Sequence, residues 1–421
     1  MASNVNSSSP RVTIVGGGMI TRIQLLPTIY HLQREGLLGE IHINALNTSP
    51  LVDIQNDASL RKAFVNQTFI PHPDPEKVDA KQAFPDLFKQ VLAAAPKYSI
   101  AVIAVPDQFH YDAVSAAIDS DLHVCVVKPL VLSHVQAEEI GHKAMSKGLL
   151  VGVDYHKRFD ARNLMARQSY RAGRFGDFRL GQAHLHEPWY YRHSNFQNWL
   201  TCENSDAFTY IGCHYVDLVA FITGLKPVAV SLYGVKEAYP NGKIGYLWTD
   251  GRVIWENGAV LSVANALGYP DAAAGGNSQG MTMWCRQEND GCLISHSDQD
   301  RGVKHSYTAA GDEPGDTQYA EPNPDYFQLL DQGGPGLVPS GYGHRSVEYI
   351  LKACLGIAGE RDVTRRQAIL KQYDDQGIMA TPFNSSYNEL VMEAGRKSIL
   401  SGGREVVIEY GPQAGVKFRE Y

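Results

Sequence analysis

The stretch VTIVGGGMIT, residues 12–21, joins an apolar run to a glycine-rich turn. A helix-forming sequence follows at once, so the stretch predicts a strand, a tight turn and a helix in succession. Gly16 and Gly18 have the G-x-G spacing that lets such a turn approach a pyrophosphate, whose charge is stabilised at the helix N-terminus. We therefore interpret Gly16, Gly18, Met19 and Ile20 as the first part of a dinucleotide-binding site.

The same alternation of strand and helix continues along the chain as far as about residue 152. Repeated strand–helix units of this kind predict a parallel, doubly wound sheet. From residue 153 onward, runs of alternating apolar and polar residues instead predict antiparallel strands with one covered face. Between two of these runs, Asn257 and Gly258 predict a tight primed turn of a hairpin.

The length of the chain, 421 residues, is too great for one ordinary core and favours two domains. We expect a polar tail at 1–10, a dinucleotide-binding domain at 11–152 and a domain for substrate binding and oligomerisation at 153–421. Within the last domain, the segment 311–342 is rich in Pro, Gly and Asp, which indicates an extended loop or an insertion.

The composition is typical of a globular protein, with 44% hydrophobic and 20% charged residues. A net charge of −7 provides no general attraction to nucleic acid or to anionic membranes, so neither is expected as a partner. The N-terminal tail lacks the apolar core of a signal peptide, and no apolar run approaches about 18 residues. We expect a soluble, cytoplasmic protein whose six cysteines are reduced and mostly buried.

The end of the second strand bears on the choice between NAD and NADP. An acidic residue there would bind both ribose hydroxyls, and an arginine would pair with a 2′-phosphate. The strand IHINAL ends instead at Asn47, which can bind a hydroxyl without repelling a phosphate. The sequence favours NAD and leaves NADP open.

Lys128 directly follows the buried strand HVCVV at 123–127. The carboxyl end of a strand is where ligands bind in an open parallel sheet. The plainer alternative is a surface lysine in a loop. Because Pro129 fixes the backbone next to it, we interpret Lys128 as a placed functional residue.

Several segments, taken together in this order, resemble the glucose-fructose oxidoreductase / inositol dehydrogenase (Gfo/Idh/MocA) family. They are VTIVGGGMI, IAVIAVPDQFHYDAVSAAI, HVCVVKPL, VGVDYHKRFD and GCHYVDL, with SYNELVMEAGRKSILSGG matching the closing helix of the family. The resemblance covers roughly 10–230 and 380–410. It rests on the order and spacing of the motifs more than on any one of them.

The resemblance implies an α/β fold with an N-terminal Rossmann domain and a C-terminal α/β domain that has an open, mostly antiparallel sheet. It also implies an NAD(P)-dependent dehydrogenase of sugars or cyclitols that forms a homo-oligomer through this sheet. The lysine of the family's Glu-Lys-Pro signature contacts cofactor and substrate, which carries over to Lys128, although Val127 replaces the glutamate. Val105, Pro106 and His110 are likewise assigned to the cofactor.

The family places an aspartate and a histidine four residues apart on a helix of the second domain. His214 matches the histidine, whereas Tyr210 stands at the aspartate position. A separation of four residues puts both side chains on one helical face. Imidazole suits the general base, so we assign the base to His214 and oxygen binding to Tyr210 and Lys128, with the reverse roles of Tyr210 and His214 as a close second. Asp217 could orient the imidazole, contact substrate or complete a polar patch.

The basic segment of the family between the two domains matches Tyr155, Lys157 and Arg158, which we assign to substrate binding. Structural ion pairs would explain these residues as well.

A metal site is an alternative for the histidines that follow in the second domain. His184, His186 and His193 could supply imidazoles to zinc. The neighbouring stretches WYYRH and NFQNW are richer in aromatic and amide groups, which suit the faces and hydroxyls of sugars. We therefore favour a carbohydrate-binding wall that includes Trp189, and no metal.

Three functions remain open at this stage. The leading one is dehydrogenation of a sugar, glycoside or cyclitol hydroxyl. A second is glycoside cleavage in which tightly held NAD oxidises one carbon transiently. The third is a non-catalytic dinucleotide-binding regulator, and the presence of both Lys128 and His214 argues against it.

Overall fold

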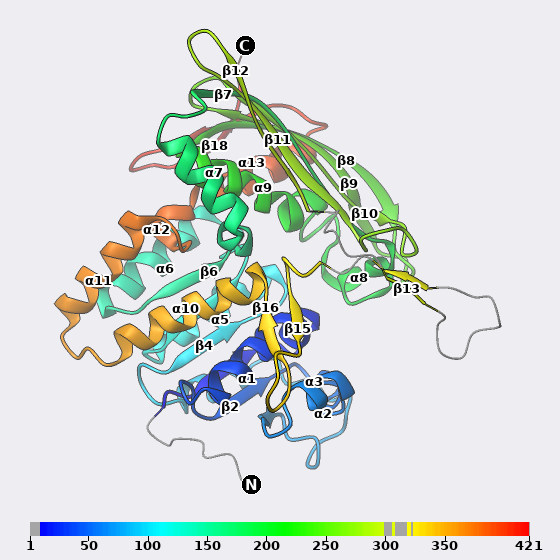
Figure 1. The fold of residues 1–421 in the computed structure, drawn as a ribbon, viewed down its shortest axis with the longest axis vertical. Coiled ribbons are helices and arrows are strands. Elements are labelled where there is room, and N and C mark those ends of the chain that lie inside the picture. Colours follow the sequence, from blue (N-terminus) through cyan, green and yellow to red (C-terminus); the bar gives the residue numbers. More distant parts are fainter. Residues whose placement is uncertain (1–8, 299–304, 308–317, 321–322, 421) are drawn as a thin grey trace. The chain divides into compact units, whose positions relative to one another are not determined.

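The computed structural model describes residues 9–298, 305–307, 318–320 and 323–420. Two compact units make up the chain, each with its own sheet (Figure 1). The N-terminal unit comprises Met1–Asp160 and Tyr326–Ser386, and the C-terminal unit comprises Ala161–Asp325 and Tyr387–Tyr421.

The sheet of the N-terminal unit is six-stranded and parallel, in the order β3-β2-β1-β4-β5-β6. Its strands are β1 (Val12–Val15), β2 (Ile41–Asn44), β3 (Ile70–His72), β4 (Ile100–Ile103), β5 (His123–Val127) and β6 (Val151–Asp154). Four of them, β1, β2, β4 and β6, are buried along their whole length, as expected where helices cover both faces of a parallel sheet. The predicted doubly wound sheet is thus confirmed.

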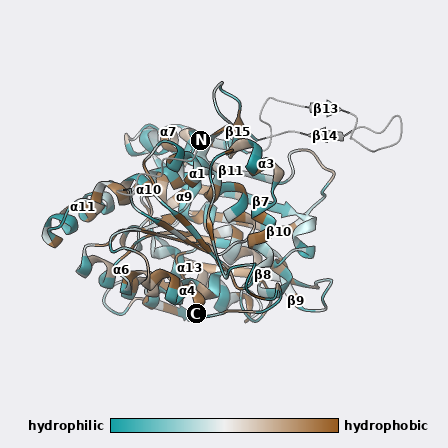
Figure 2. Ribbon diagram, turned by 90° about the horizontal axis from the view of Figure 1, so that it is seen from below, coloured by the Kyte–Doolittle hydropathy of each residue, from teal (hydrophilic) through white to brown (hydrophobic). Residues whose placement is uncertain are grey.

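Helices connect these strands and pack on the sheet. They are η1 (Thr21–Leu25), α1 (Leu26–Arg34), α2 (Ser49–Gln55), α3 (Ala58–Ala63), α4 (Leu87–Ala93), η2 (Asp107–Phe109), α5 (His110–Asp119), α6 (His134–Lys147) and η3 (His156–Phe159). Figure 2 shows hydrophobic and hydrophilic residues alternating along the helices. The order of strands reverses between β1 and β4, and ligands bind at the carboxyl edge of a sheet beside such a point.

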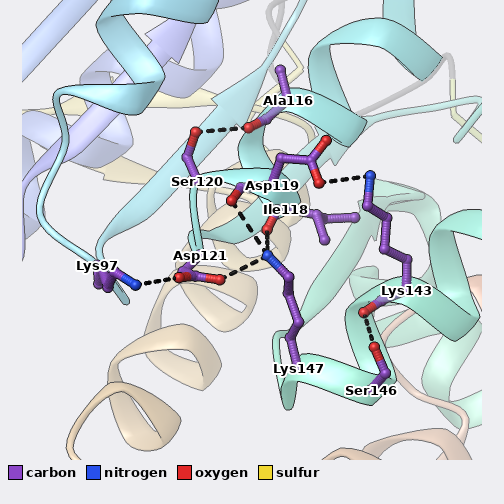
Figure 3. A network of polar contacts seen from close by, with 9 residues as sticks. All are labelled: Lys97, Ala116, Ile118, Asp119, Ser120, Asp121, Lys143, Ser146 and Lys147. Atoms are coloured by element: carbon purple, nitrogen blue, oxygen red, sulfur yellow. Dashed lines mark hydrogen bonds and ion pairs between the residues drawn. The ribbon is translucent and has the colours of Figure 1, made fainter.

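Charged side chains at the opposite edge of this sheet serve the fold (Figure 3). The Lys147 ammonium donates to Oδ1 of Asp121 at 2.8 Å and to the carbonyl of Ile118 at 2.9 Å. Lys97 donates to the other carboxylate oxygen of Asp121 at 2.7 Å. Hydrogen bonds from Lys147 and Lys97 lower the pKa of Asp121 below its ordinary value. These contacts join the end of α6 to the turns that precede β4 and β5.

One segment distant in sequence completes the N-terminal unit. Its elements are β15 (Gln328–Leu330), β16 (Val338–Ser340), α10 (Tyr342–Ala358), α11 (Val363–Gln376) and α12 (Pro382–Ser385). The apolar face of α10 buries Val347, Ile350 and Leu351 in the same core as β1 and β2. The sequence predicts that all of 153–421 belongs to the second domain, whereas in the structure Tyr326–Ser386 packs with the first.

The C-terminal unit is built on an eight-stranded sheet in the order β12-β11-β7-β10-β9-β8-β17-β18. The strands are β7 (Asp177–Pro188), β8 (Pro227–Ala238), β9 (Ile244–Trp255), β10 (Val260–Tyr269), β11 (Ser278–Arg286), β12 (Gly291–Ser297), β17 (Val406–Glu409) and β18 (Gly415–Phe418). Only the β7–β10 pair is parallel, so the sheet is mostly antiparallel as predicted.

Helices cover one face of this sheet (Figure 1). The unit contains α7 (Ala161–Arg171), η4 (Trp189–His193), α8 (Phe196–Trp199), η5 (Phe208–Gly212), α9 (Cys213–Thr223) and α13 (Tyr387–Ile399), together with the short strands β13 (His305–Tyr307) and β14 (Gln318–Ala320). The predicted fold class, a Rossmann domain followed by an α/β domain with an open sheet, is confirmed.

The turn between β9 and β10 differs from the predicted primed turn. Gly258 has φ +80°, but Asn257 is not among the residues with positive φ. The amide of Gly258 donates to the carbonyl of Trp255 at 2.8 Å, and the amide of Trp255 donates to the carbonyl of Ala259 at 2.9 Å. This is a three-residue loop with a glycine bulge, which also satisfies the strand twist.

Part of the predicted loop or insertion at 311–342 lies outside the described residues, as does most of the tail at 1–10. The described part of 311–342 contains β14, β15 and β16. Among the helices of the described segments, none combines the length and apolar character that crossing a membrane requires. All six cysteines are free thiols, and four of them are buried.

Candidate active site

The glycine-rich turn after β1 packs tightly against the end of β4. Gly16 has φ +114°, and a Cβ at this position would lie 2.0 Å from the carbonyl oxygen of Ala104. The hydroxyl of Thr21 donates to the carbonyl of Gly16 at 2.7 Å and fixes the turn from the other side. Only glycine fits this conformation and this space.

The outer part of the turn is open. A Cβ on Gly18 would meet nothing within 4 Å, Met19 is exposed, and Ile20 is half-buried. Helical structure begins at once with η1, so backbone amides of the turn and of the helix start are available to an anion. The turn therefore has room for the pyrophosphate of a dinucleotide, and the predicted contacts of Gly16, Gly18, Met19 and Ile20 with the cofactor stay predictions.

The second strand ends earlier than predicted, at Asn44 rather than Asn47. Asn44 is buried and donates to the carbonyl of His72 at 3.3 Å. Asn47 lies in the loop beyond it, where its Oδ1 accepts the backbone amide of Ser49 at 3.1 Å. This hydrogen bond fixes the Asn47 side chain in the loop just before α2 (Ser49–Gln55).

His110 connects two loops at the carboxyl edge of the sheet. Its Nε2 lies 2.9 Å from the carbonyl oxygen of Val105, and its Nδ1 lies 2.7 Å from that of Pro129. The ring is fully buried, whereas Val105 and Pro106 are half-buried. His110 thus holds the segment after β4 against the segment after Lys128. Its predicted contact with the cofactor stays a prediction, as do those of Val105 and Pro106.

Lys128 follows β5 beside a buried carboxylate at the end of β6. Val127 and Asp154 are register partners in these parallel strands. Burial raises the pKa of Asp154 to about 6, against the opposing effects of hydrogen bonds from Ser346 and Gln24 and of the charge on Lys128. Lys128 itself is half-buried. The edge therefore holds a cation and a carboxylate in one poorly solvated region.

Tyr155, Lys157 and Arg158 are all buried within the N-terminal unit. The Lys157 ammonium lies 5.7 Å from the centre of the Tyr342 ring, and Arg158 donates to Oδ1 of Asn384 at 3.4 Å. The guanidinium of Arg158 also lies 5.8 Å from the centre of the Tyr155 ring, so all three residues have contacts within their own unit. Their predicted contact with substrate stays a prediction.

The helix that carries Tyr210 and His214 begins differently from the predicted regular helix. Tyr210 lies in the π-helical turn η5, and His214 lies in the first turn of α9. Gly212 allows this turn to approach β10, because a Cβ there would lie 2.7 Å from Oδ1 of Asn265. His214 is buried and Tyr210 is half-buried. A π-turn has i→i+5 hydrogen bonds and more residues per turn than an α-helix. Tyr210 and His214 are therefore not stacked on one helical face as they would be in a regular α-helix.

An aromatic cluster, made of Tyr191, Phe196, Trp199 and Tyr210, surrounds the predicted catalytic tyrosine. The Phe196 ring lies 5.0 Å from Tyr191, 5.3 Å from Trp199 and 4.9 Å from Tyr210, measured between ring centroids. Trp199 is 5.4 Å from Tyr210. The fold thus brings the stretches WYYRH (189–193) and NFQNW (195–199) together with Tyr210, which follows later in the sequence.

Trp189 lies at the beginning of the same stretch and is 43% exposed. The guanidinium of Arg192 covers one face of its ring at 3.9 Å from the ring centroid. The other part of Trp189 is exposed to solvent, and its predicted place in a carbohydrate-binding wall stays a prediction.

Asp217 connects α9 to α13. Its Oδ1 accepts hydrogen bonds from the hydroxyl of Tyr387 at 2.9 Å and from the amide of Asn388 at 3.0 Å. The side chain is buried. These bonds indicate that Asp217 fixes the helix carrying His214, and its predicted contact with substrate stays a prediction.

The histidines considered for zinc lie on β7 and η4. His184 and His186 have ring centroids 5.6 Å apart, and Nε2 of His184 lies 3.2 Å from the hydroxyl of Ser278. His193 is exposed on η4. Within the described residues, the three do not form a group whose ligand atoms all lie within 4.8 Å of one another.

Sequence reasoning missed the polar network behind Lys128. Gln24, Asp154, Tyr326 and Ser346 belong to it, and they come from η1, from β6 and from the returning segment. A signal was present in two places, because Asp154 ends an apolar strand and Gln24 interrupts an apolar helix.

Comparisons with known proteins identify the family and the fold. A family model described as an oxidoreductase family with an NAD-binding Rossmann fold (GFO_IDH_MocA) matches residues 10–155, and the GFO/IDH/MocA C-terminal domain model matches 163–275. An uncharacterized oxidoreductase of Schizosaccharomyces pombe is 29% identical over 123 residues, which are 28% of this chain and 33% of that protein. The scyllo-inositol 2-dehydrogenase (NADP(+)) IolW of Bacillus subtilis is 23% identical over 48% of this chain and 55% of its own length. The chain thus spans a third to about half of these curated relatives.

Solved structures share the fold over nearly the whole chain. GenD2 from gentamicin A biosynthesis, in complex with NAD, has a TM-score of 0.64 at 14% identity and covers 97% of this chain and 99% of its own. A scyllo-inositol dehydrogenase from Lactobacillus casei, with bound NAD(H) and scyllo-inositol, has a TM-score of 0.60 at 15% identity over 95% and 99% of the two chains.

Proposed function

The chain belongs to the Gfo/Idh/MocA family of oxidoreductases with an NAD-binding Rossmann domain, and on this premise we propose that it is a dehydrogenase of sugars, glycosides or cyclitols. It would transfer hydride between a secondary hydroxyl-bearing carbon and nicotinamide. The observation that carries the proposal is that Lys128 follows a buried strand at the same carboxyl edge as the Gly16–Gly18 turn.

NAD bound at this edge would supply the hydride acceptor. The chain's own residues then have two tasks, to hold the substrate oxygen and to accept its proton. We assign oxygen binding to the Lys128 ammonium and the Tyr210 hydroxyl, and proton acceptance to a ring nitrogen of His214. The reverse assignment, with Tyr210 as the base, is the competing scheme.

For the cofactor we propose NAD in preference to NADP. Asn47 and the adjacent residues Thr48 and Ser49 offer no cationic side chain for a 2′-phosphate. Arg22 lies on η1, and its guanidinium is paired with Asp57 at 3.2 Å. Initial rates with both cofactors test this, and a higher kcat/KM with NADP would refute it.

For the substrate we propose a ring polyol. The aromatic cluster around Tyr210 and the exposed Trp189 support it, because flat aromatic surfaces suit the apolar faces of sugar rings. The curated IolW and the Lactobacillus casei structure are named for scyllo-inositol, which places cyclitols in the first panel of substrates.

The test is a panel of pyranosides, nitrophenyl glycosides and inositols monitored at the absorbance of reduced nicotinamide. Lys128→Ala should bind NAD and lose most of its turnover. Lys97→Ala, at the opposite edge of the sheet, is the matched control and should retain it. A Lys128→Ala protein that binds NAD and oxidises polyols at the wild-type rate would refute the proposal.

The same panel separates the alternatives. Release of nitrophenol without accumulation of NADH would identify glycoside cleavage assisted by a retained cofactor. Binding of NAD with no turnover of any polyol would identify a non-catalytic protein.

We also propose a homo-oligomer formed through the large sheet. Leu180, Trp284 and Leu293 are register partners across β7, β11 and β12, and all three are exposed. A row of exposed apolar side chains on a sheet indicates an interaction surface. Light scattering should give a mass above that of one chain, and Trp284→Lys should lower it.

A further inference from the structure

Asp154 ends β6 beside the residue that precedes Lys128. Its register partner on β5 is Val127, and neighbouring strands of a sheet lie about 4.8 Å apart. Lys128 therefore follows directly on the position that pairs with Asp154, and its charge acts to lower the pKa of the Asp154 carboxyl. Asp154 is only 2% exposed, so water contributes little to the solvation of its charge.

The carboxylate is held in one orientation by two neutral donors. Oδ2 accepts from the side-chain amide of Gln24 at 2.9 Å, and Oδ1 accepts from the hydroxyl of Ser346. Gln24 is itself fixed, because its Oε1 accepts from the hydroxyl of Tyr326 at 2.7 Å and its amide also donates to the carbonyl of Gly343 at 3.2 Å. A network of this kind determines where the negative charge lies.

Neutral donors alone do not compensate a buried charge, so a cation is needed nearby. Other titratable groups face this region. Burial raises the pKa values of the Cys125 thiol on β5 and the Cys354 thiol on α10, which stay neutral. Burial, with the charges of Lys157 and Lys128, keeps the pKa of His156 well below its ordinary value, so this ring is neutral as well.

We propose that Asp154 is the positioning residue for Lys128, holding the ammonium charged and in place at the carboxyl edge. Gln24 joins this pair to η1, the helix that follows the Gly16 turn, so the lysine and the cofactor turn share one support. The inference rests on the proposed function only in taking Lys128 as a catalytic residue. The electrostatic link between the two side chains holds without any turnover.

The first measurement needs neither cofactor nor substrate. A short pulse of acetic anhydride acetylates uncharged amines, and mass spectrometry of the peptide that contains Lys128 gives its rate of modification. At pH 8 the Asp154 carboxylate is ionised and favours the ammonium form. In Asp154→Asn the lysine should react faster than in wild type, because the negative charge that favours the ammonium form is gone.

Asp374→Asn is the matched control. Asp374 is a half-buried carboxylate on α11 of the same unit, where it accepts a hydrogen bond from Thr381 at 2.5 Å, and burial raises its pKa. This variant should leave the modification rate of Lys128 at the wild-type value. If Asp154→Asn also leaves it unchanged in folded protein, the inference is wrong.

Ser346→Ala covers the case in which Asp154→Asn does not fold. It keeps the carboxylate but removes a donor that favours the ionised form. Lys128 should then react faster near pH 7, where more Asp154 is protonated, and at the wild-type rate at pH 9. If Ser346→Ala and wild type react at equal rates at pH 7 as well as at pH 9, the inference is wrong. A merely structural role of Ser346 predicts no difference between variant and wild type that depends on pH.

Activity supplies the second readout. In Asp154→Asn the alkaline limb of kcat against pH should move to lower pH, while the KM for polyol changes less than kcat. If no polyol is oxidised but the acetylation rates change as expected, the proposed function fails and the link between Asp154 and Lys128 stands. If polyols are oxidised normally and the acetylation rates do not change, the proposed function stands and the link between Asp154 and Lys128 is wrong.

Discussion

Replacement of Gly16 by alanine should unfold the N-terminal unit at a markedly lower temperature. The residue has φ +114°, a conformation that costs an L-residue about 1–3 kcal/mol. The new Cβ would also lie 2.0 Å from the carbonyl oxygen of Ala104, a backbone atom that cannot move without displacing β4. Overpacking of this kind costs about 1–3 kcal/mol more.

The two costs together give about 4 kcal/mol. For a unit of this size, each kcal/mol lowers the melting temperature by about 2–4 °C, so we expect a decrease of about 10 °C. Thermal unfolding followed by circular dichroism measures it, and titration with NAD measures the loss of binding that accompanies the distorted turn.

Gly18→Ala is the matched control for this prediction. Its Cβ would meet nothing within 4 Å, so the melting temperature should stay within about 2 °C of wild type. The methyl group would occupy the open side of the turn, so NAD affinity should still fall. If Gly16→Ala melts like wild type and binds NAD equally well, the close approach of Gly16 to Ala104 does not limit the size of this residue and the prediction is wrong.

Three further predictions concern buried polar groups. Burial raises the pKa of Asp154 from 3.8 to about 6, so its protonated form contributes about 3 kcal/mol to stability well below pH 4, and this contribution is lost as the pH rises through 6. The stability of Asp154→Asn relative to wild type, measured by urea unfolding, should therefore increase by about 2 kcal/mol between pH 4 and pH 7. His110→Ala should cost about 2–4 kcal/mol and weaken NAD binding in calorimetry, because the loops after β4 and β5 lose their connection. Asp217→Ala should cost about 3 kcal/mol, as it leaves the donors of Tyr387 and Asn388 buried without this acceptor, and Asp217→Asn should recover part of the loss in the same unfolding assay.

The parts of the molecule that the sequence predicts well are those encoded by local pattern. The buried parallel strands are continuous apolar runs, and the glycine-rich turn follows directly on the first of them. Lys128 was recognisable because no charge precedes it on β5. In each case the residues that determine the structure lie within about ten positions of one another.

The parts that the sequence did not predict depend on contacts between distant residues. Gln24 and Ser346 lie 130 and 192 positions away from Asp154, so nothing in their own surroundings indicates a shared carboxylate. The π-turn before His214 ends at Gly212, which lies close to Asn265 of β10, and the helical pattern of the sequence does not contain this contact. The hairpin turn at Asn257 and Gly258 shows a smaller difference. An Asn-Gly pair fits both a two-residue primed turn, as predicted, and a three-residue loop with a glycine bulge, as found.

The return of Tyr326–Ser386 to the N-terminal unit has a consequence for synthesis of the protein. A chain emerging from the ribosome has made all six strands of the first sheet by residue 154, yet α10, which covers β6 and buries Ile350 against Gly152, follows almost 200 residues later. Until then the apolar surface of that sheet face lacks its own cover. The first unit therefore cannot finish folding before the second unit has largely been translated, and chaperone binding is expected in this interval.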